Sequence, residues 1–444
     1  MSTCPHASFG LPWDEGDAPP PVEALREARA TLGSTFTVRS GEDDYLFLFS
    51  DEGLRSFYGL PERDASKGLA DFHMLLRKLP PELFDGRRTF AHDLFGAQEV
   101  ETYLDRLDLA LDVECAGLPD AGEVDAFDLT RRLGHRLGLA CWIGPEVAAG
   151  PTFERFAADL DVLDGAESFV RPERGAAGER GYDRERRALA RLEAELAVVL
   201  ADRRDRGGDD GGGEERGDDG DFLSRIAGRW SDAAGESHVR GVAGDVVLLH
   251  VATMTNLVAA LGWTLVRVLQ DPDSAARVRA REPEVASRCA LEAIRLAQRS
   301  IMMRTALRPL EIADHGGPRA VERGTIVATM LPVTNLDPSS AEPGAVEVAP
   351  LDRWSPDRWR GRLRGAPIGV DVAERVTTFG HGAHRCPARR FSMSAIVRTL
   401  ERLLDEFDLA LAVATVPEPP PFQIGGVARA DGSCPLVLRR RQVR

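Results

Sequence analysis

Cys386 is the residue of this chain whose type and setting most clearly allow chemistry. It lies in a run of small residues, cations and one thiol, Phe379-Gly-His-Gly-Ala-His-Arg-Cys386-Pro-Ala388. Apolar residues then recur at helical spacing, which predicts a helix just after the thiol, at Ile396, Leu400, Leu403 and Phe407. The start of a helix carries partial positive charge, and full charges are added by Arg385, Arg389 and Arg390. This setting favours a thiolate over a thiol.

Three interpretations of Cys386 are open on the residues alone. A lone cysteine is most often a small buried hydrophobic residue. A thiolate among cations can also be a nucleophile. A thiolate at the start of a helix can instead be the axial ligand of a haem iron. Gly380, Gly382 and Ala383 would let the backbone approach a flat group closely, which suits the third interpretation.

The composition is that of a large folded protein. The chain has 444 residues, of which 43% are hydrophobic, and this length alone would allow more than one domain. Residues 203–220 are all Gly, Asp, Glu or Arg, so this segment has nothing to bury and is predicted to be a disordered surface loop. Helical patterns on both sides of it favour one large, mainly helical domain.

The net charge and the distribution of apolar residues bear on where the protein is located and on what it binds. A net charge of −15 argues against nucleic acid, because phosphate binding needs a basic surface. Lysine occurs only at Lys67 and Lys78, and such dependence on arginine is typical of a GC-rich bacterial genome. Residues 1–21 lack a signal-peptide pattern, and polar side chains interrupt the apolar stretch 246–269. We therefore expect a cytoplasmic protein that does not contact a membrane.

The segment around Cys386 resembles the haem-binding loop of the cytochrome P450 family. The family pattern F-x-x-G-x-x-x-C-x-(G/A) is met by Phe379, Gly382, Cys386 and Ala388. The resemblance implies the cytochrome P450 fold, which is mainly α with small β-sheets, and haem b (iron protoporphyrin IX) as the cofactor. It also implies that Cys386 binds the iron and that His384 contacts a haem propionate. The resemblance extends from about residue 221 to the end of the chain.

Three more residues resemble an ionic triad of the same family. Glu292 and Arg295 are three apart in a predicted helix, 284–298, and share one face, so they can pair. Such a pair is common on helix surfaces, and its position ahead of Cys386 is what matches the family. Arg358 matches the third member, and its planar guanidinium can bind a carboxylate while staying charged in the interior. The implied role is structural.

The same resemblance implies roles for two residues that follow the predicted helix 284–298. Arg304 would bind a haem propionate, although by itself it is an ordinary cation on a predicted strand. Met303 would line the substrate cavity. Neither role follows from the residue types alone.

A second helix, predicted over residues 244–269, is expected to cross the opposite face of the haem. Helical spacing gives one face to five residues, Ala252, Thr253, Asn256, Leu257 and Ala260. By the resemblance, Ala252 would lie against the haem, Thr253, Thr255 and Asn256 would handle protons, and Leu257 would line the substrate pocket. Most oxygen-activating members have an acid and a threonine where this chain has Thr255 and Asn256. Asn at this position resembles the branch with cholesterol 7-alpha-hydroxylase and prostacyclin synthase.

Several functions remain open on the sequence. The first is a haem-thiolate monooxygenase of bacterial secondary metabolism, which oxidises a small or medium organic substrate and receives electrons from ferredoxin and ferredoxin reductase. The second is an isomerase, dehydratase or peroxygenase that needs no redox partner. Two residues of the predicted helix 244–269 suggest it: Asn256 cannot titrate as an acid does, and Leu257 is apolar. The third is a haem protein without catalysis, such as a sensor.

Overall fold

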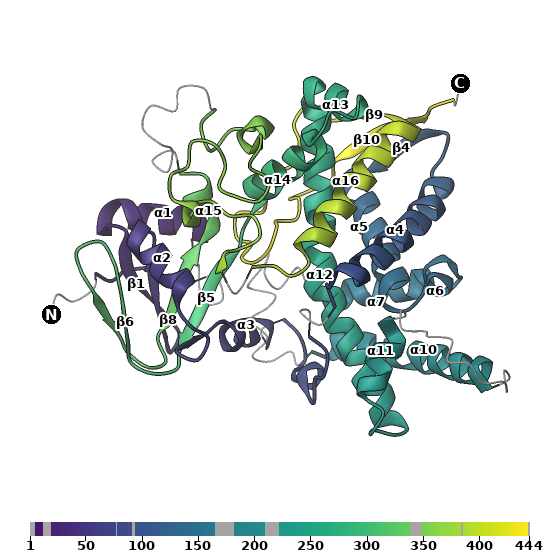
Figure 1. Cartoon of the computed structure of the whole chain (residues 1–444), viewed down its shortest axis with the longest axis horizontal. Helices are drawn as coiled ribbons and strands as arrows, with labels where there is room; N and C mark the ends of the chain where they lie inside the picture. The colour runs from purple at the N-terminus through teal and green to yellow at the C-terminus, as the bar shows by residue number, and fades with distance from the viewer. Residues whose placement is uncertain are drawn as a thin grey trace.

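Helices form most of the molecule, and the long helix α12 (Glu236–Gln270) runs through their middle (Figure 1). The structure is a computed structural model that describes residues 5–11, 19–76, 78–90, 94–164, 182–208, 222–337, 349–382 and 385–442. The mainly α architecture with small sheets, predicted from the sequence, is confirmed. The other α-helices are α1 (Pro21–Leu32), α2 (Asp51–Gly59), α3 (Lys67–Leu76), α4 (Ala97–Gly117), α5 (Ala126–Trp142), α6 (Pro145–Ala149), α7 (Phe153–Asp164), α10 (Asp183–Gly208), α11 (Phe222–Arg229), α13 (Pro272–Arg279), α14 (Val285–Ala297), α15 (Leu331–Asn335) and α16 (Arg389–Glu406). Short 3-10 helices are η1 (Pro81–Phe84), η4 (Pro356–Trp359) and η5 (Ala373–Arg375).

The strands form three small sheets. The largest has the order β1-β2-β8-β5-β3 and lies at the end of the molecule away from α4 to α7 (Figure 1). In this sheet β2 and β8 run parallel, with Tyr45 opposite Ile326, and the other pairs are antiparallel. The remaining sheets are β4-β10-β9 and β6-β7. The strands are β1 (Thr35–Ser40), β2 (Asp43–Leu48), β3 (Ala65–Ser66), β4 (Ala121–Asp125), β5 (Ile301–Ala306), β6 (Leu310–Ile312), β7 (Arg319–Val321), β8 (Ile326–Met330), β9 (Phe407–Leu411) and β10 (Pro435–Arg440).

Helix α12 is the centre of the core, and it begins earlier than the predicted residue 244. It packs against α5, α14, α10 and α16. Its length and hydropathy would suffice to cross a membrane, but 83% of its most apolar window is buried inside the protein, which is typical of a core helix. Between residues 245 and 266 every residue is buried except Ala252 and Asn256, which are exposed, and Thr255, which is half-buried. The helix therefore borders accessible space at one place along its middle.

One prediction about residues 203–220 is wrong at its start. Residues 203–208 are the last turns of α10 and do not form a loop. Arg203 holds this end of the helix, because its guanidinium lies 3.1 Å from Glu146 Oε1 and also donates to the carbonyl of Ile143. Such contacts with α6 are not visible in a local composition. Residues 209–220 lie outside the described residues.

Candidate active site

One hydrogen bond and two glycines fix the backbone conformation of the loop that contains Cys386 and precedes α16. The N–H of Cys386 donates to the carbonyl oxygen of Phe379 at 2.8 Å, which closes the loop. Gly380 and Gly382 have φ of 75° and 63°, a region that side chains other than glycine rarely adopt. A Cβ at Gly382 would also lie 3.3 Å from the carbonyl oxygen of Tyr58. Two of the small residues predicted to shape this loop are thus required by its geometry.

The electrostatic prediction for Cys386 is only partly correct. Burial raises the pKa of the Cys386 thiol, whereas hydrogen bonds from the N–H groups of Ala388 and Arg389 and the charge of Arg389 lower it. The sum is a raised pKa, so the protein alone does not favour the thiolate. The helix begins at Arg389, three residues after Cys386. A bound metal cation would supply the positive charge that this site needs to hold a thiolate.

The predicted face of α12 is divided between the core and accessible space. Ala252 and Asn256 are exposed, but Thr253 and Leu257 are buried, with 8% and 3% of their surface accessible. Thr253 donates its hydroxyl to the carbonyl of Leu249 at 2.6 Å, and Leu257 belongs to the main hydrophobic cluster. The structure therefore does not place Thr253 or Leu257 where protons or substrate were expected. Their burial follows from the packing of α12 against several helices at once.

Asn256 is attached to a loop near the end of the chain. Its side-chain oxygen accepts the N–H of Val427 at 2.8 Å. The neighbouring Gly426 has φ of 61°, and a Cβ there would overlap that same oxygen. Because the oxygen is engaged, the amide NH2 is the part of Asn256 that can face the accessible space.

Thr255 lies beside a buried group of charges that the sequence did not indicate. Its hydroxyl oxygen is 2.7 Å from Asp164 Oδ1, and Asp164 is the last residue of α7. Asp164 also pairs with Lys78 Nζ at 3.1 Å and with the guanidinium of Arg429. We call Lys78, Asp164, Thr255 and Arg429 the ionic cluster. The one available signal was Lys78, since lysine is so rare in this chain.

The predicted contacts of the triad are present and fully buried. Glu292 accepts two bonds from Arg295, at 2.8 and 2.9 Å, and one from Arg358 Nε at 2.9 Å. All three side chains have 1% or less of their surface accessible. Trp359 Nε1 and the N–H of Ser355 also donate to Glu292, each at 3.0 Å. The triad joins α14 to η4, which agrees with a structural role.

The remaining predicted residues are spread over other parts of the molecule. Arg304 lies on β5, buried, and donates to the carbonyl of Leu60 at 2.9 Å. Met303 is 4% accessible and packs in the hydrophobic cluster under the large sheet, so its place does not support a role in lining a substrate cavity. His384 lies outside the described residues. His381 in the same loop is in edge contact with Tyr58, with ring centroids 5.0 Å apart.

The residues present suit haem b on two observations. Cys386 is half-buried, whereas the other cysteines that the structure describes are buried, so Cys386 borders accessible space. Ala252 and Asn256 open the otherwise buried middle of α12. Since α16 follows the thiol and packs against α12, both openings come from neighbouring elements. A small apolar residue and a thiol are what a flat haem and its iron require.

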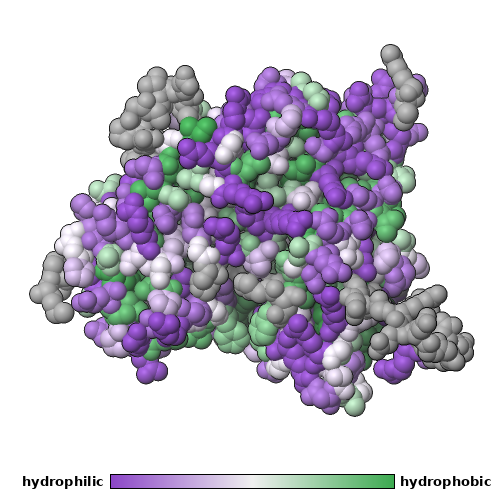
Figure 2. Space-filling view, viewed as in Figure 1, coloured by the Kyte–Doolittle hydropathy of each residue, from purple (hydrophilic) through white to green (hydrophobic). Residues whose placement is uncertain are grey.

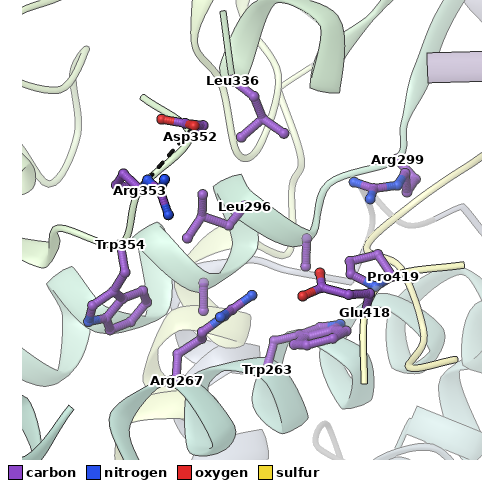
Figure 3. A pocket seen from close by; sticks show the side chains of 12 residues that line it. Trp263, Arg267, Leu296, Arg299, Leu336, Asp352, Arg353, Trp354, Glu418 and Pro419 are labelled. Carbon is purple, nitrogen blue, oxygen red and sulfur yellow. Dashed lines mark ion pairs between the residues drawn. The ribbon is translucent and has the colours of Figure 1, made fainter. Parts of the chain in front are cut away.

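A cavity of about 500 Å³ lies apart from the candidate site. It is bordered by the end of α12, the end of α14 and the segments around residues 299, 336, 352–354 and 418–419, and Figure 3 shows Glu418 between Arg299 and the ring of Trp263. Trp263 is fixed there because its indole N–H donates to the carbonyl of Ala428 at 2.7 Å. Neither Cys386 nor the accessible residues of α12 line this cavity, so it is separate from the candidate site.

Comparison with known proteins connects this site to a family. No protein-family model matches the chain. The cytochrome P450 monooxygenase pyvB of Aspergillus violaceofuscus is 24% identical over 438 residues, which cover 91% of this chain and 83% of that protein. The cytochrome P450 monooxygenase hepE of Aspergillus oryzae is 34% identical over 100 residues, 20% of this chain and 18% of that protein. The 24-hydroxycholesterol 7-alpha-hydroxylase of Homo sapiens is 22% identical over 216 residues, 44% of this chain and 43% of that protein. The chain is thus similar, over most of its length in the first case, to proteins named as cytochrome P450 monooxygenases, a family whose cofactor is haem b, and its helical fold with small sheets agrees with that similarity.

Proposed function

We propose that Cys386 binds the haem iron through its sulfur and that the protein is a monooxygenase of a small or medium organic substrate. The observation that carries this proposal is the half-buried thiol held in a loop closed by the Cys386 to Phe379 hydrogen bond. Haem bound through a thiolate activates dioxygen, because the thiolate pushes electron density towards the iron. The N–H groups of Ala388 and Arg389 would then tune the sulfur by donating to it.

The residues on the opposite side support oxygen activation more than the sequence does. The acid that α12 lacks next to Asn256 is available from α7, because Asp164 lies 2.7 Å from the hydroxyl of Thr255. A carboxylate can take up and release a proton, and a hydroxyl can pass it on. The NH2 group of Asn256 can donate a hydrogen bond into the accessible space. In this proposal Asp164 and Thr255 move protons, and Asn256 orients what binds next to it.

Electrons would reach the site from a small acidic protein such as ferredoxin, delivered by its reductase. Arg385 is exposed and has no ion pair among the described residues. Other arginines on α16 are matched by carboxylates on α4, as in Arg390 with Glu101 and Arg398 with Asp108. Most of the surface in this view is hydrophilic (Figure 2). An acidic partner would dock where cations remain to be matched.

A second candidate function keeps the haem but omits the redox partner. An isomerase, dehydratase or peroxygenase would use a substrate that already contains an oxidised group. Asn256 favours it, because an amide in the accessible patch of α12 can bind oxygen atoms without titrating. Leu257 gives it no support, since that residue is buried in the core.

One spectrum and one isotope experiment test these proposals. Cys386→Ala is expected to abolish the thiolate-type spectrum of the carbon monoxide complex, while Cys115→Ala, which removes another buried thiol, is expected to leave it. A thiolate-type spectrum in Cys386→Ala would contradict the ligand assignment. Turnover with labelled dioxygen should then place the label in the product only when reductant is present. Product formed from a peroxide or other oxidised substrate without reductant would instead support the second candidate.

A further inference from the structure

One buried side chain organises the loop that contacts the middle of α12. Gln423 has 7% of its surface accessible, and its NH2 group donates to the carbonyls of Gly425 and Val427, at 3.2 and 3.3 Å. Its side-chain oxygen accepts a backbone N–H of the same loop at 3.0 Å. Both hydrogens and the oxygen of this amide are therefore bonded within the loop. We call residues 423–429 the Gln423 loop.

The Gln423 loop is attached to its surroundings on two sides. Just after α14, the backbone N–H of Arg299 donates to the carbonyl of Gly426 at 2.8 Å, and the N–H of Ala428 donates to the carbonyl of Ala297 at 2.8 Å. On α12, the indole N–H of Trp263 donates to the carbonyl of Ala428 at 2.7 Å. These bonds hold the loop at a fixed position beside α12.

The position of this loop decides which end of the Asn256 amide faces the accessible space. The N–H of Val427 can only donate, so the atom of Asn256 that lies 2.8 Å from it is the oxygen. Gly426 leaves room for that oxygen, because a Cβ at this position would overlap it. No described residue accepts a hydrogen bond from the NH2 group of Asn256. The amide therefore presents its donor end outward.

Asn256 supplies the free side-chain donor in this part of α12. Ala252 is apolar, and the hydroxyl oxygen of Thr255 lies 2.7 Å from Asp164 Oδ1 and 2.8 Å from the carbonyl oxygen of Val251. An amide that can turn over serves equally as donor or acceptor. Held by the Gln423 loop, the amide of Asn256 serves as a donor, so a ligand beside it gains a hydrogen bond by presenting an acceptor.

We propose that the Gln423 loop makes Asn256 a one-directional hydrogen-bond donor and that the substrate presents an acceptor oxygen, of a carbonyl or an ether, to it. Asn256 contacts the substrate, whereas Gln423 and Gly426 are positioning residues that act through Asn256. This inference rests on the proposed function in one respect, that the substrate binds at the accessible part of α12.

Two pairs of probes with nearly equal shape test the proposal. Cyclohexanone and methylenecyclohexane differ by an oxygen in place of a CH2 group, and acetophenone and α-methylstyrene differ in the same way. Isothermal titration of the haem-loaded protein gives the ratio of ketone affinity to alkene affinity within each pair. Changes in this ratio between variants report the hydrogen bond, because burial of the common frame and hydration of the free probes cancel.

Asn256→Asp is the decisive variant, because it keeps the shape of the side chain and an acceptor for Val427 but replaces the donor by a carboxylate oxygen. The ketone-to-alkene ratio is expected to fall about tenfold or more in both pairs, with little change for the alkenes. Lowering the pH should restore the ratio, since a protonated carboxyl group at this position donates again. An unchanged ratio, or no binding of any of the four probes to the unchanged protein, would overturn the proposal.

Two variants of the loop test the positioning role. Gln423→Leu removes three hydrogen bonds from the loop, and Gly426→Ala displaces the oxygen of Asn256. Each should lower the ratio about threefold or more, because a loosened amide can also turn its oxygen towards the ligand. Gln270→Leu is the matched control, since Gln270 is an exposed amide at the end of α12. Circular dichroism verifies that each variant is folded.

A double variant separates positioning from a general loosening of the site. In the Asn256→Asp background, Gln423→Leu should lower the ratio no further, because the donor that the loop positions is already absent. A further fall there, or unchanged ratios in both loop variants, would overturn the positioning role of Gln423.

The two proposals fail in distinguishable ways. Calorimetric binding does not depend on which residue binds the iron. A normal thiolate-type spectrum with an unchanged ratio in Asn256→Asp would remove the inference and keep Cys386 as the iron ligand. A fall in the ratio without a thiolate-type spectrum would do the reverse.

Discussion

The triad and the ionic cluster contain the same charges, one carboxylate and two cations, but satisfy them differently. In the triad, Arg295 donates to the carbonyl of Asn335 at 2.6 Å in addition to Glu292. Arg358 donates to the carbonyls of Ala349 and Pro350, each at 3.1 Å. In the cluster, Arg429 has Asp164 and no backbone acceptor among the described residues.

This difference indicates how a buried charge group can be assigned a role. Backbone carbonyls complete the triad, so nothing further can bind to it, and it connects α14 to η4 permanently. In the cluster, the Nε–H of Arg429 is buried without an acceptor among the described residues, and the cluster lies next to an accessible part of α12. Net charge alone would not separate the two groups. The two groups differ in how many of the hydrogen-bond donors of their arginines have an acceptor among the described residues.

The largest effect is expected from Glu292→Gln. The change leaves Arg295 and Arg358 buried without a counter-charge, and removing one partner of a buried ion pair costs roughly 3–5 kcal/mol. Urea unfolding followed by circular dichroism should show this loss. Glu282→Gln is the control, because Glu282 is itself exposed and its partners Arg277 and Arg288 both keep Asp357, so it should change stability far less. Equal losses in the two variants would mean that the triad does not differ from a surface pair.

A smaller loss, of about 2 kcal/mol, is expected from Asp164→Asn, because Arg429 keeps 29% of its side chain accessible and the amide still accepts hydrogen bonds. Equal losses in Asp164→Asn and Glu292→Gln, measured by the same urea unfolding, would remove the distinction between the two groups.

The smallest effect concerns a buried group without excess charge. His250 on α12 stacks on His135, with ring centroids 5.2 Å apart, and burial followed by the proximity of His135 holds the pKa of His250 well below 6.5. The unfolded chain takes up a proton near pH 6.5 that folded His250 does not, so stability present above that pH is lost as the pH falls. Between pH 7 and pH 5.5 this amounts to about 1 kcal/mol. His250→Gln should flatten the dependence by that amount, whereas the exposed His315→Gln should not. Parallel pH curves for His250→Gln and the unchanged protein would contradict the assignment.

The sequence predicts the triad and misses the cluster for a physical reason. Glu292 and Arg295 are three residues apart on one helix, so their pairing is local, and Arg358 follows from the resemblance to the cytochrome P450 family. Lys78, Asp164, Thr255 and Arg429 come from four distant segments, and no spacing rule connects them. Only the folded chain brings them together.

The same limit applies to the two faces of the proposed haem site. The loop of Cys386 is predictable because its glycines and thiol are contiguous. The pKa of the Cys386 thiol cannot be predicted in this way, because burial by distant residues raises it more than the local cations lower it. Helical spacing predicts that Ala252 and Asn256 share a face, but burial of Leu257 and Thr253 depends on which helices pack there.

The parallel pairing of β2 with β8 bears on the order of folding. Tyr45 and Ile326 are partners although the helices from α2 to α14 lie between them in the chain. Closing so long a loop costs entropy before any strand contact forms, and such non-local pairings slow folding. We therefore expect the helices between α4 and α14 to assemble first and to shorten the effective distance between the two strands, so that the large sheet closes late.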